Sequence, residues 1–307
     1  RVAADGLVQQ QPAWAPDIRL LAFADDRDGQ FHIYLYDFLS HQERQLTAGD
    51  ASDVSPVWSP DGSSLAYVRG GDEIHVLALG AHGGARNAPP TDRVVAHAFL
   101  DRAPFVAERA LVWSPDGRWL AFATSEGNKL FANSYLVSAA GGETRAVSWM
   151  SKTNADDLEW SPDGTFLLMV TSQRTEPGAV ARIDLVPRTP RFREDQFRDL
   201  FTTEAPPTPT ERRSSPAPRV TPHDTIRGPT RDSASDTTHP AARDSTARAA
   251  DSAHRVADRY ITGWGDVWLT RLSLLPIGLD VVSEVLAPDG KSVAVSEIAA
   301  GQANIYV

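Results

Sequence analysis

The chain has 307 residues, of which 41% are hydrophobic and 23% are charged, a composition typical of a folded protein long enough for one large repeat domain. It contains no cysteine, which excludes disulfide bonds, iron–sulfur clusters, thiolate zinc sites and a cysteine nucleophile. The formal net charge is -10 without a dense Lys/Arg cluster, so nucleic acid is not an expected partner. The sequence also predicts no membrane span, because no apolar stretch reaches roughly 18 residues.

A tryptophan followed by Ser-Pro-Asp-Gly is the repeated feature of the chain. It begins at Trp58, Trp113 and Trp160, and relaxed copies stand at Trp14 and Ala287. Steps of roughly 45 to 55 residues separate the four tryptophans, close to the period of about 40 to 50 residues of propeller repeats. The sequence therefore predicts an all-β protein, a β-propeller of four-stranded antiparallel blades.

The residues around each repeat predict its strands. Pro fixes φ at the second position of a turn, while Asp and Gly supply the side-chain hydrogen bond and the permissive backbone of the reversal. Apolar runs then predict second strands over residues 65–68, 120–123 and 166–170. In the first unit, Asp28-Gly29 predicts a hairpin turn, residues 31–37 a third strand and residues 44–47 a fourth. Each tryptophan is expected to wedge between adjacent blades.

The last unit and a long insertion define the expected domain organisation. The fifth unit has Ala287 in place of the tryptophan and ends within its third strand, so we expect four fuller blades and one partial blade of an incomplete ring. Residues 203–258 are rich in Pro, Ser, Thr, Ala, Arg and Asp, which predicts a disordered insert, or alternatively a linker or partner-binding segment. The expected divisions are propeller blades 1–4 over residues 1–202, the insert, and continuation of the propeller over residues 259–307.

Sequence motifs for catalysis are absent from the chain. It has no Gly-x-Ser-x-Gly elbow, His-Glu-x-x-His zinc motif, phosphate loop or dinucleotide fingerprint. We therefore expect no catalytic residue, no cofactor and no metal ligand. His32 and His75 fall in predicted third strands, where a structural hydrogen bond is the expected role. The acidic run over residues 25–29 resembles a cation loop in composition, but it is also the predicted hairpin turn.

A dispersed set of charges is the candidate binding site. Asp53, Glu108 and Asp156 stand four or five residues before their tryptophans, near the start of each expected inner strand. Residues at these strand ends can reach the mouth of the central channel. A carboxylate ring there, with Arg109 as a counter-charge, could attract basic peptide termini or a cation. Solvated loop ends are the alternative interpretation.

The repeats resemble the TolB-like, or PD40 (WD40-like), propeller class found in TolB, tricorn-type proteases and some hydrolases. Two segments beside the insert, Phe-Arg-Glu-Asp-Gln-Phe-Arg-Asp-Leu-Phe and Arg-Leu-Ser-Leu-Leu-Pro-Ile-Gly-Leu-Asp, look like the N-terminal propeller region of bacterial tricorn-like peptidases of family S41. That resemblance implies that a PDZ-like domain and a C-terminal α/β domain with a nucleophilic serine follow the propellers. It also implies that the propellers guide or gate peptides.

Three functions are consistent with these observations. The first is a non-catalytic propeller fragment of a secreted or periplasmic tricorn-like serine peptidase, with peptides and the PDZ-like and protease domains as partners. The second is a TolB-like platform that recruits a protein partner. The third is the propeller of another PD40-bearing hydrolase, of the prolyl-oligopeptidase or amidohydrolase type. Sequence beyond the chain would separate them.

Overall fold

The computed structural model describes eight segments of the chain, all of which belong to strands, turns or loops: residues 9–80, 90–100, 111–125, 132–149, 153–173, 177–186, 271–299 and 302–307. No described segment forms a helix, and so none offers a helix of the length and apolarity needed to cross a bilayer. The chain divides into one unit made of Arg1–Pro187 with Thr246–Val307 and a second unit, Arg188–Ser245. The predicted disordered insert, residues 203–258, lies outside the described residues.

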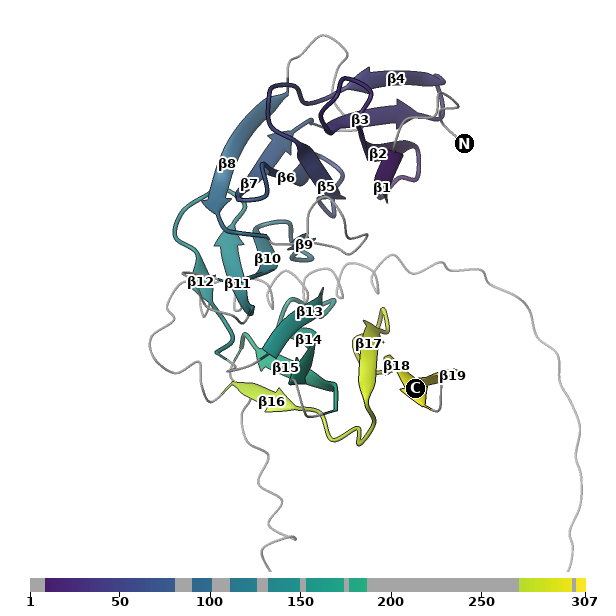
Figure 1. Ribbon diagram of the computed structural model, residues 1–307, viewed down its shortest axis with the longest axis vertical. Coiled ribbons are helices and arrows are strands. Elements are labelled where there is room, and N and C mark those ends of the chain that lie inside the picture. Colours follow the sequence, from purple (N-terminus) through teal and green to yellow (C-terminus); the bar gives the residue numbers. More distant parts are fainter. Residues whose placement is uncertain are drawn as a thin grey trace, which may run out of the picture. The chain divides into compact units, whose positions relative to one another are not determined.

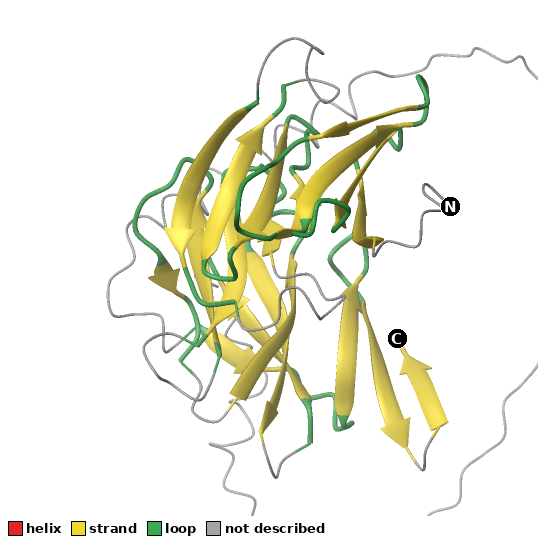
Figure 2. Ribbon diagram, turned by 45° about the horizontal axis from the view of Figure 1, so that its top comes forward, coloured by secondary structure: helices red, strands yellow, loops and turns green. Residues whose placement is uncertain are grey.

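Five antiparallel sheets make up the first unit (Figures 1 and 2). Blade 1 contains β1 (Gln9–Trp14), β2 (Leu20–Asp25), β3 (His32–Asp37) and β4 (Gln42–Gln45). Blade 2 contains β5 (Asp53–Trp58), β6 (Ser64–Arg69), β7 (Glu73–Ala78) and β8 (Thr91–His97). Blade 3 contains β9 (Leu111–Trp113), β10 (Trp119–Thr124), β11 (Asn133–Ser138) and β12 (Arg145–Ala146).

Blades 4 and 5 follow the same order of strands. Blade 4 contains β13 (Thr153–Trp160), β14 (Phe166–Gln173), β15 (Ala179–Asp184) and β16 (Leu272–Leu274). Blade 5 contains β17 (Val281–Leu286), β18 (Val293–Ala299) and β19 (Gln302–Tyr306). The outer strand of blade 4 is thus supplied from the far side of the predicted insert. In every sheet, neighbours in space are neighbours in sequence, so the protein is an all-β propeller of antiparallel blades, as predicted.

In blades 2, 3 and 4 the Ser-Pro-Asp-Gly segment closes the first hairpin through its own side chains. In blade 2, Gly62 N–H donates to the carbonyl of Ser59 at 2.9 Å, and Ser59 Oγ accepts the N–H of Ser64 at 2.9 Å. Asp61 accepts hydrogen bonds from the Ser59 hydroxyl and from the Ser63 N–H. Gly62 adopts φ 69°, a left-handed conformation that glycine reaches without strain. The predicted role of this motif as a turn is confirmed.

The corresponding turn of blade 1 differs from the others at one residue. Ile18 stands where the other turns have glycine and adopts φ 51°, whereas Gly62, Gly117 and Gly164 each have φ 69°. A β-branched side chain in the left-handed region clashes with its own backbone. Blade 1 therefore carries local strain that the other blades avoid.

Two details of the predicted strands were wrong. The fourth strand of blade 1 covers Gln42–Gln45 rather than residues 44–47. Beyond it, Leu46 N–H still donates to the Ile33 carbonyl at 2.7 Å, but the Ile33 N–H donates to the Thr47 hydroxyl at 2.9 Å rather than to a main-chain carbonyl. In blade 5, Leu286 pairs with Val293 as Trp160 pairs with Leu167. Leu286 therefore holds the position of the tryptophan, and Ala287 holds that of the serine.

Adjacent blades are joined by the tryptophans. The indole Nε1–H of Trp58 donates to the carbonyl of Ala13 at 3.1 Å, and that of Trp113 donates to Val57 at 3.0 Å. Trp160 donates in the same way to Val112 at 3.3 Å. Each acceptor is the residue just before the equivalent tryptophan of the preceding blade. We call this bond the indole staple, and for these three tryptophans it confirms the prediction that they wedge between blades. For Trp14, which is 51% exposed, the prediction was wrong.

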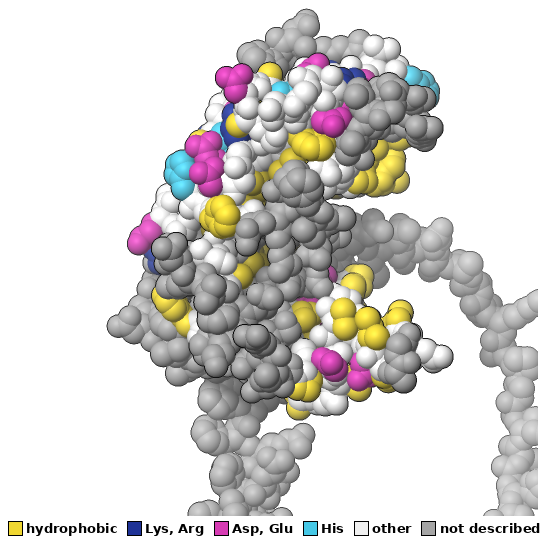
Figure 3. All heavy atoms as spheres, viewed as in Figure 1, with side chains coloured by type: hydrophobic (Ala, Val, Ile, Leu, Met, Phe, Trp, Pro, Cys, Tyr) yellow, Lys and Arg dark blue, Asp and Glu magenta, His cyan; other side chains and the backbone are white. Residues whose placement is uncertain are grey.

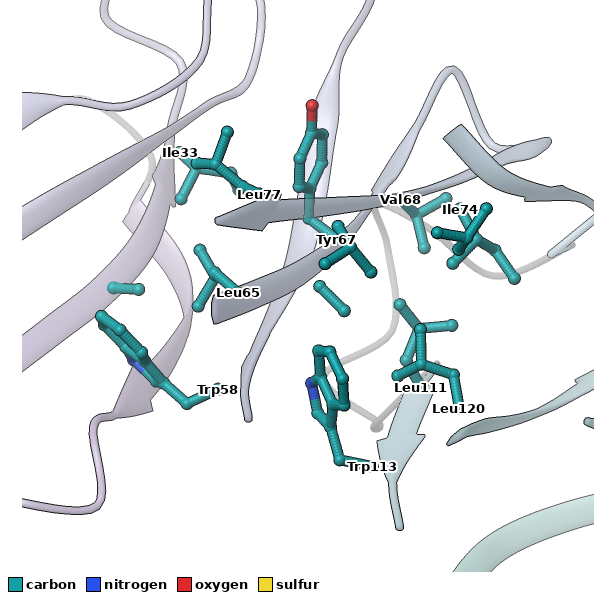
Figure 4. Close-up of a cluster of buried hydrophobic side chains, with 14 of the residues drawn as sticks. Ile33, Trp58, Leu65, Tyr67, Val68, Ile74, Leu77, Leu111, Trp113 and Leu120 are labelled. Carbon is teal, nitrogen blue, oxygen red and sulfur yellow. The ribbon is translucent and has the colours of Figure 1, made fainter. Parts of the chain in front are cut away.

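Apolar side chains fill the space between the stapled blades. One buried cluster runs across blades 1 to 3, with Ile33, Leu65, Tyr67, Leu111 and Trp113 among its members (Figure 4). Two further clusters join blade 3 to blade 4 and blade 4 to blade 5. Burial of this kind of surface supplies about 25 cal/mol for each Å² removed from water. The blades are therefore held together by inter-blade packing as well as by staples.

Candidate functional site between blades 1 and 2

Asp53, one of the predicted channel-mouth residues, lies at the first position of β5 and is 0% exposed. The register of the first hairpin places it directly opposite Arg69. Arg69 donates to it twice, from Nε to Oδ1 at 2.7 Å and from Nη2 to Oδ2 at 3.0 Å. On the other side, His32 Nδ1 of blade 1 lies 3.4 Å from Asp53 Oδ2. The Asp53 carboxylate is thus enclosed by protein partners from two blades.

Arg69 links this buried carboxylate to a second acidic group. Its Nη1 lies 3.6 Å from Oδ2 of Asp92, which reaches across from β8. Asp92 also accepts the Tyr67 hydroxyl at 2.8 Å and lies 3.1 Å from His75 Nδ1. Tyr67 and His75 are cross-strand neighbours whose rings stack with centroids 5.0 Å apart. Antiparallel pairing of β6, β7 and β8 therefore lines up four polar groups in one row.

The row continues from His75 to the surface. His75 Nε2 lies 3.1 Å from Glu73 Oε2, so its imidazole bridges two carboxylates. His97 Nδ1, on an exposed side chain, lies 3.8 Å from Glu73 Oε1. Acidic and histidine side chains lie together on the surface over β8 (Figure 3). We name Asp53, Arg69, Asp92, His75, Glu73 and His97 the blade-2 charge relay, which alternates carboxylates with basic groups.

Charge pairing shifts the pKa values within the relay. Burial disfavours a charged imidazole, but the hydrogen bonds to Asp92 and Glu73 outweigh it and raise the pKa of His75. Burial likewise disfavours a carboxylate, but hydrogen bonds from His75 and Tyr67 outweigh it and lower the pKa of Asp92. Both shifts favour the ion pair between His75 and Asp92. The relay can therefore hold a proton on the buried His75, between two partly exposed carboxylates.

The other predicted site residues are not brought into this relay by the described structure. Glu108 and Arg109 lie outside the described residues. Asp156 is in β13, where its main chain pairs with Val170, and its side chain lies outside what the structure describes. The carboxylate ring at the channel mouth consequently stays a prediction.

The acidic run at residues 25–29 forms the hairpin turn between β2 and β3, as predicted. Gly29 N–H donates to the carbonyl of Asp26 at 2.8 Å and closes the turn. Arg27 forms an ion pair with Asp25, and the Tyr34 hydroxyl donates to Asp28 at 2.7 Å. Across the described residues, no group of three or more His, Asp or Glu side chains is arranged to hold a metal ion.

The N-terminal region of dipeptidyl peptidase IV is the family whose model matches this chain, over residues 26–130. The peptidase YuxL of Bacillus subtilis is 28% identical over 183 residues, which are 57% of this chain and 24% of that protein. TolB of Rickettsia bellii is 39% identical over 66 residues, 19% of this chain and 14% of that protein. The chain therefore spans about a quarter or less of the length of these relatives.

Two solved structures are partly similar to the chain. TolB from Acinetobacter baumannii aligns with a TM-score of 0.46 at 19% identity, covering 60% of this chain and 42% of that one. The tricorn protease aligns with a TM-score of 0.44 at 12% identity, covering 61% and 19%. The chain is an all-β propeller, parts of which are similar in sequence to the N-terminal region of dipeptidyl peptidase IV and to TolB. Family S41 is a narrower assignment that belongs with the proposals below.

Proposed function

We propose that this chain is the non-catalytic propeller of a tricorn-like serine peptidase and that it guides or gates peptides on their way to a catalytic domain. The match to the N-terminal region of dipeptidyl peptidase IV over residues 26–130 carries the proposal. The similarity to the peptidase YuxL supports it, because both point to peptidases rather than to other classes of propeller protein. Proteolysis would then occur in domains outside this chain.

The blade-2 charge relay is the surface that we assign to peptide binding within this function. Glu73 is partly exposed at its outer end, beside the exposed His97. Together with the net charge of -10, a carboxylate there would attract a peptide with a basic side chain or a free α-amino group. Asp53 is buried, so its proposed contribution is to position Arg69. Glu108, Arg109 and Asp156 remain the proposed channel-mouth groups.

Peptide binding is measured on the chain itself. Fluorescence anisotropy compares labelled basic peptides whose N-terminus is free with the same peptides acetylated. We expect the free amine to bind more tightly, and Glu73→Gln to reduce that preference about tenfold. Glu143→Gln, which alters an exposed carboxylate in blade 3, is the matched control and should leave binding unchanged. Equal binding of both peptides contradicts the assignment of this surface.

A second experiment tests the peptidase assignment without relying on the relay. A fluorophosphonate probe, which labels activated serines, is applied to the intact protein that carries this chain, and the labelled residue is mapped by mass spectrometry. Labelling outside residues 1–307 agrees with the proposal. Labelling inside them would show that the propeller itself is catalytic and would contradict it.

A TolB-like platform for a protein partner is the second candidate function. It is favoured by the 39% identity to TolB of Rickettsia bellii over 66 residues. The same probe separates the two candidates, because a platform protein has no activated serine. Failure of the intact protein to react, together with co-purification of a stoichiometric protein partner, would support the platform and reject the peptidase.

A further inference from the structure

Glu73, near the outer end of the blade-2 charge relay, lies between two histidines. His75 Nε2 is 3.1 Å from Glu73 Oε2, and His97 Nδ1 is 3.8 Å from Glu73 Oε1. The two imidazoles differ in exposure, because the side chain of His75 is 5% exposed and that of His97 is 73% exposed. The carboxylate that we assign to peptide binding therefore has one buried and one exposed basic neighbour.

The balance of charges along the relay determines what the exposed histidine does. Arg69 donates two hydrogen bonds to Asp53, at 2.7 and 3.0 Å, so these two charges offset each other. His75 lies 3.1 Å from both Asp92 and Glu73. Burial opposes a charge on this imidazole, but the hydrogen bonds to the two carboxylates outweigh burial and raise its pKa. One imidazolium between two carboxylates leaves one negative charge to be compensated.

Other ionisable groups on the neighbouring strands and turns have different roles. Tyr67 donates its hydroxyl to Asp92 at 2.8 Å, and burial raises its pKa, so it stays neutral. Arg93 donates from Nε to a main-chain carbonyl of blade 3 at 3.1 Å, and Asp72 is exposed in the turn before β7. His32 lies 3.4 Å from the innermost carboxylate. The exposed imidazole is therefore the titratable group that the described structure pairs with the outer carboxylate.

We infer that His97 is a proton switch for peptide binding: its imidazolium form occupies the Glu73 carboxylate, and its neutral form leaves that carboxylate open to a peptide cation. The inference rests on the proposed function and adds the regulation of the same surface. An imidazole gains or loses its proton between about pH 5 and 8. A positive charge on His97 compensates the relay and repels an approaching cation, so peptide binding strengthens as the pH rises.

The exposure of His97 limits the size of the effect. Ion pairs between solvent-exposed side chains change an equilibrium constant by about fivefold or less. We therefore expect a cationic peptide to bind about three- to fivefold more tightly at about pH 8 than at about pH 5.5. Fluorescence anisotropy on the chain measures both Kd values, and circular dichroism at both pH values shows that the protein is folded.

The probe is a labelled peptide whose own charge is constant over this range. Its N-terminus is acetylated, its C-terminus is amidated and a single lysine carries its charge. Lysine keeps its proton at about pH 8, because its ordinary pKa is about 10.4. The same peptide with norleucine in place of lysine has no charge, and its binding should not depend on pH.

Two histidine variants assign the effect to one side chain. His97→Gln keeps a polar side chain without the titrating ring, and it should bring the ratio of the two Kd values to about one. His41→Gln, which alters an exposed histidine of blade 1, is the matched control and should keep the full ratio.

The outcomes separate the switch from the peptide surface itself. Lysine peptide that binds equally at both pH values, binds more tightly at the lower one, or keeps its ratio in His97→Gln overturns the proton switch and leaves the peptide surface in place. Absence of binding at both pH values contradicts the assignment of the surface, and the switch with it.

Discussion

The indole Nε1–H of Trp113 donates to the main-chain carbonyl of Val57 across 3.0 Å and so joins the first strand of blade 3 to that of blade 2. The Trp113 ring is buried in the cluster that fills the same boundary. One side chain thus supplies both packing and a directed hydrogen bond. Mutation of Trp113 can therefore separate the contribution of packing to stability from that of the hydrogen bond.

Replacing Trp113 with phenylalanine keeps a ring but removes the donor. The Val57 carbonyl then loses its indole partner, and we expect the free energy of unfolding to fall by about 1 to 3 kcal/mol. Trp113→Ala also opens a cavity and should cost about 3 to 5 kcal/mol. Urea denaturation at low protein concentration measures both. The control is Trp14→Phe at the exposed equivalent position, and a loss there as large as that of Trp113→Phe would contradict the staple.

The turn of blade 1 offers a stabilising change. Ile18→Asn places a residue that tolerates the left-handed region at φ 51°. Because a β-branched residue is strained there, the variant should gain about 1 kcal/mol of unfolding free energy. The reverse experiment is Gly62→Ala in blade 2, which should lose about 1 kcal/mol. Equal effects of opposite sign would locate the strain in the backbone; a destabilised Ile18→Asn would show that the isoleucine side chain makes contacts that matter more.

Gly178 fixes blade 5 to blade 4. A Cβ at this position would lie 1.9 Å from the carbonyl oxygen of Val281, whose N–H donates to the Gly178 carbonyl at 2.9 Å. Gly178→Ala should therefore detach blade 5, and hydrogen exchange of the β18 amides should become faster than that of the β10 amides. Gly71→Ala, where a Cβ meets no atom within 4 Å, should leave this difference unchanged.

His75 makes stability depend on pH in a defined direction. Its pKa is raised in the folded state by Asp92 and Glu73 against the opposing effect of burial. A raised pKa contributes stability that is fully present below the unfolded value of about 6.5 and is lost as pH rises through the folded value. Unfolding free energies measured from pH 5 to pH 9 should therefore decline once the pH rises above about 6.5.

The variant His75→Gln should remove most of that decline. His97→Gln, on an exposed side chain farther along the relay, is the matched control and should retain it. If His75→Gln keeps the full dependence on pH, the imidazole does not carry the linked proton and its pairing with Asp92 has little effect on stability.

The repeat alone was enough to predict the class of fold and the burial of Trp58, Trp113 and Trp160, because Ser-Pro-Asp-Gly specifies a turn through local hydrogen bonds. It predicted neither the burial of Trp119 nor the exposure of Trp14. The blade-2 charge relay was not predicted, since it depends on register. Asp53 meets Arg69 only because an irregularity between Val54 and Val57 shifts the pairing of β5 with β6. Counting backwards across the hairpin from Trp58 and Leu65 would instead place Asp53 opposite Gly70, and nothing in the sequence marks the irregularity.

Blade 5 is a second place where the sequence alone did not predict the structure. The sequence led us to align Ala287 with the tryptophans, whereas strand pairing assigns that position to Leu286. No indole is present at this boundary. Instead, the carboxylate of Glu159, which precedes Trp160, accepts a hydrogen bond from the N–H of Leu286 at 2.6 Å, and no sequence motif predicts that bond. A side-chain acceptor and a main-chain donor thus substitute for the main-chain acceptor and side-chain donor of the other boundaries.

Each indole staple ends on a main-chain carbonyl, which any amino acid provides. A duplicated or transplanted unit would consequently find its acceptor in the preceding unit without any matching change of side chain there. The number of blades in such a protein can therefore change by gene duplication in a single step, and an engineered chain with an extra copy of blade 2 should fold with one more sheet in the series.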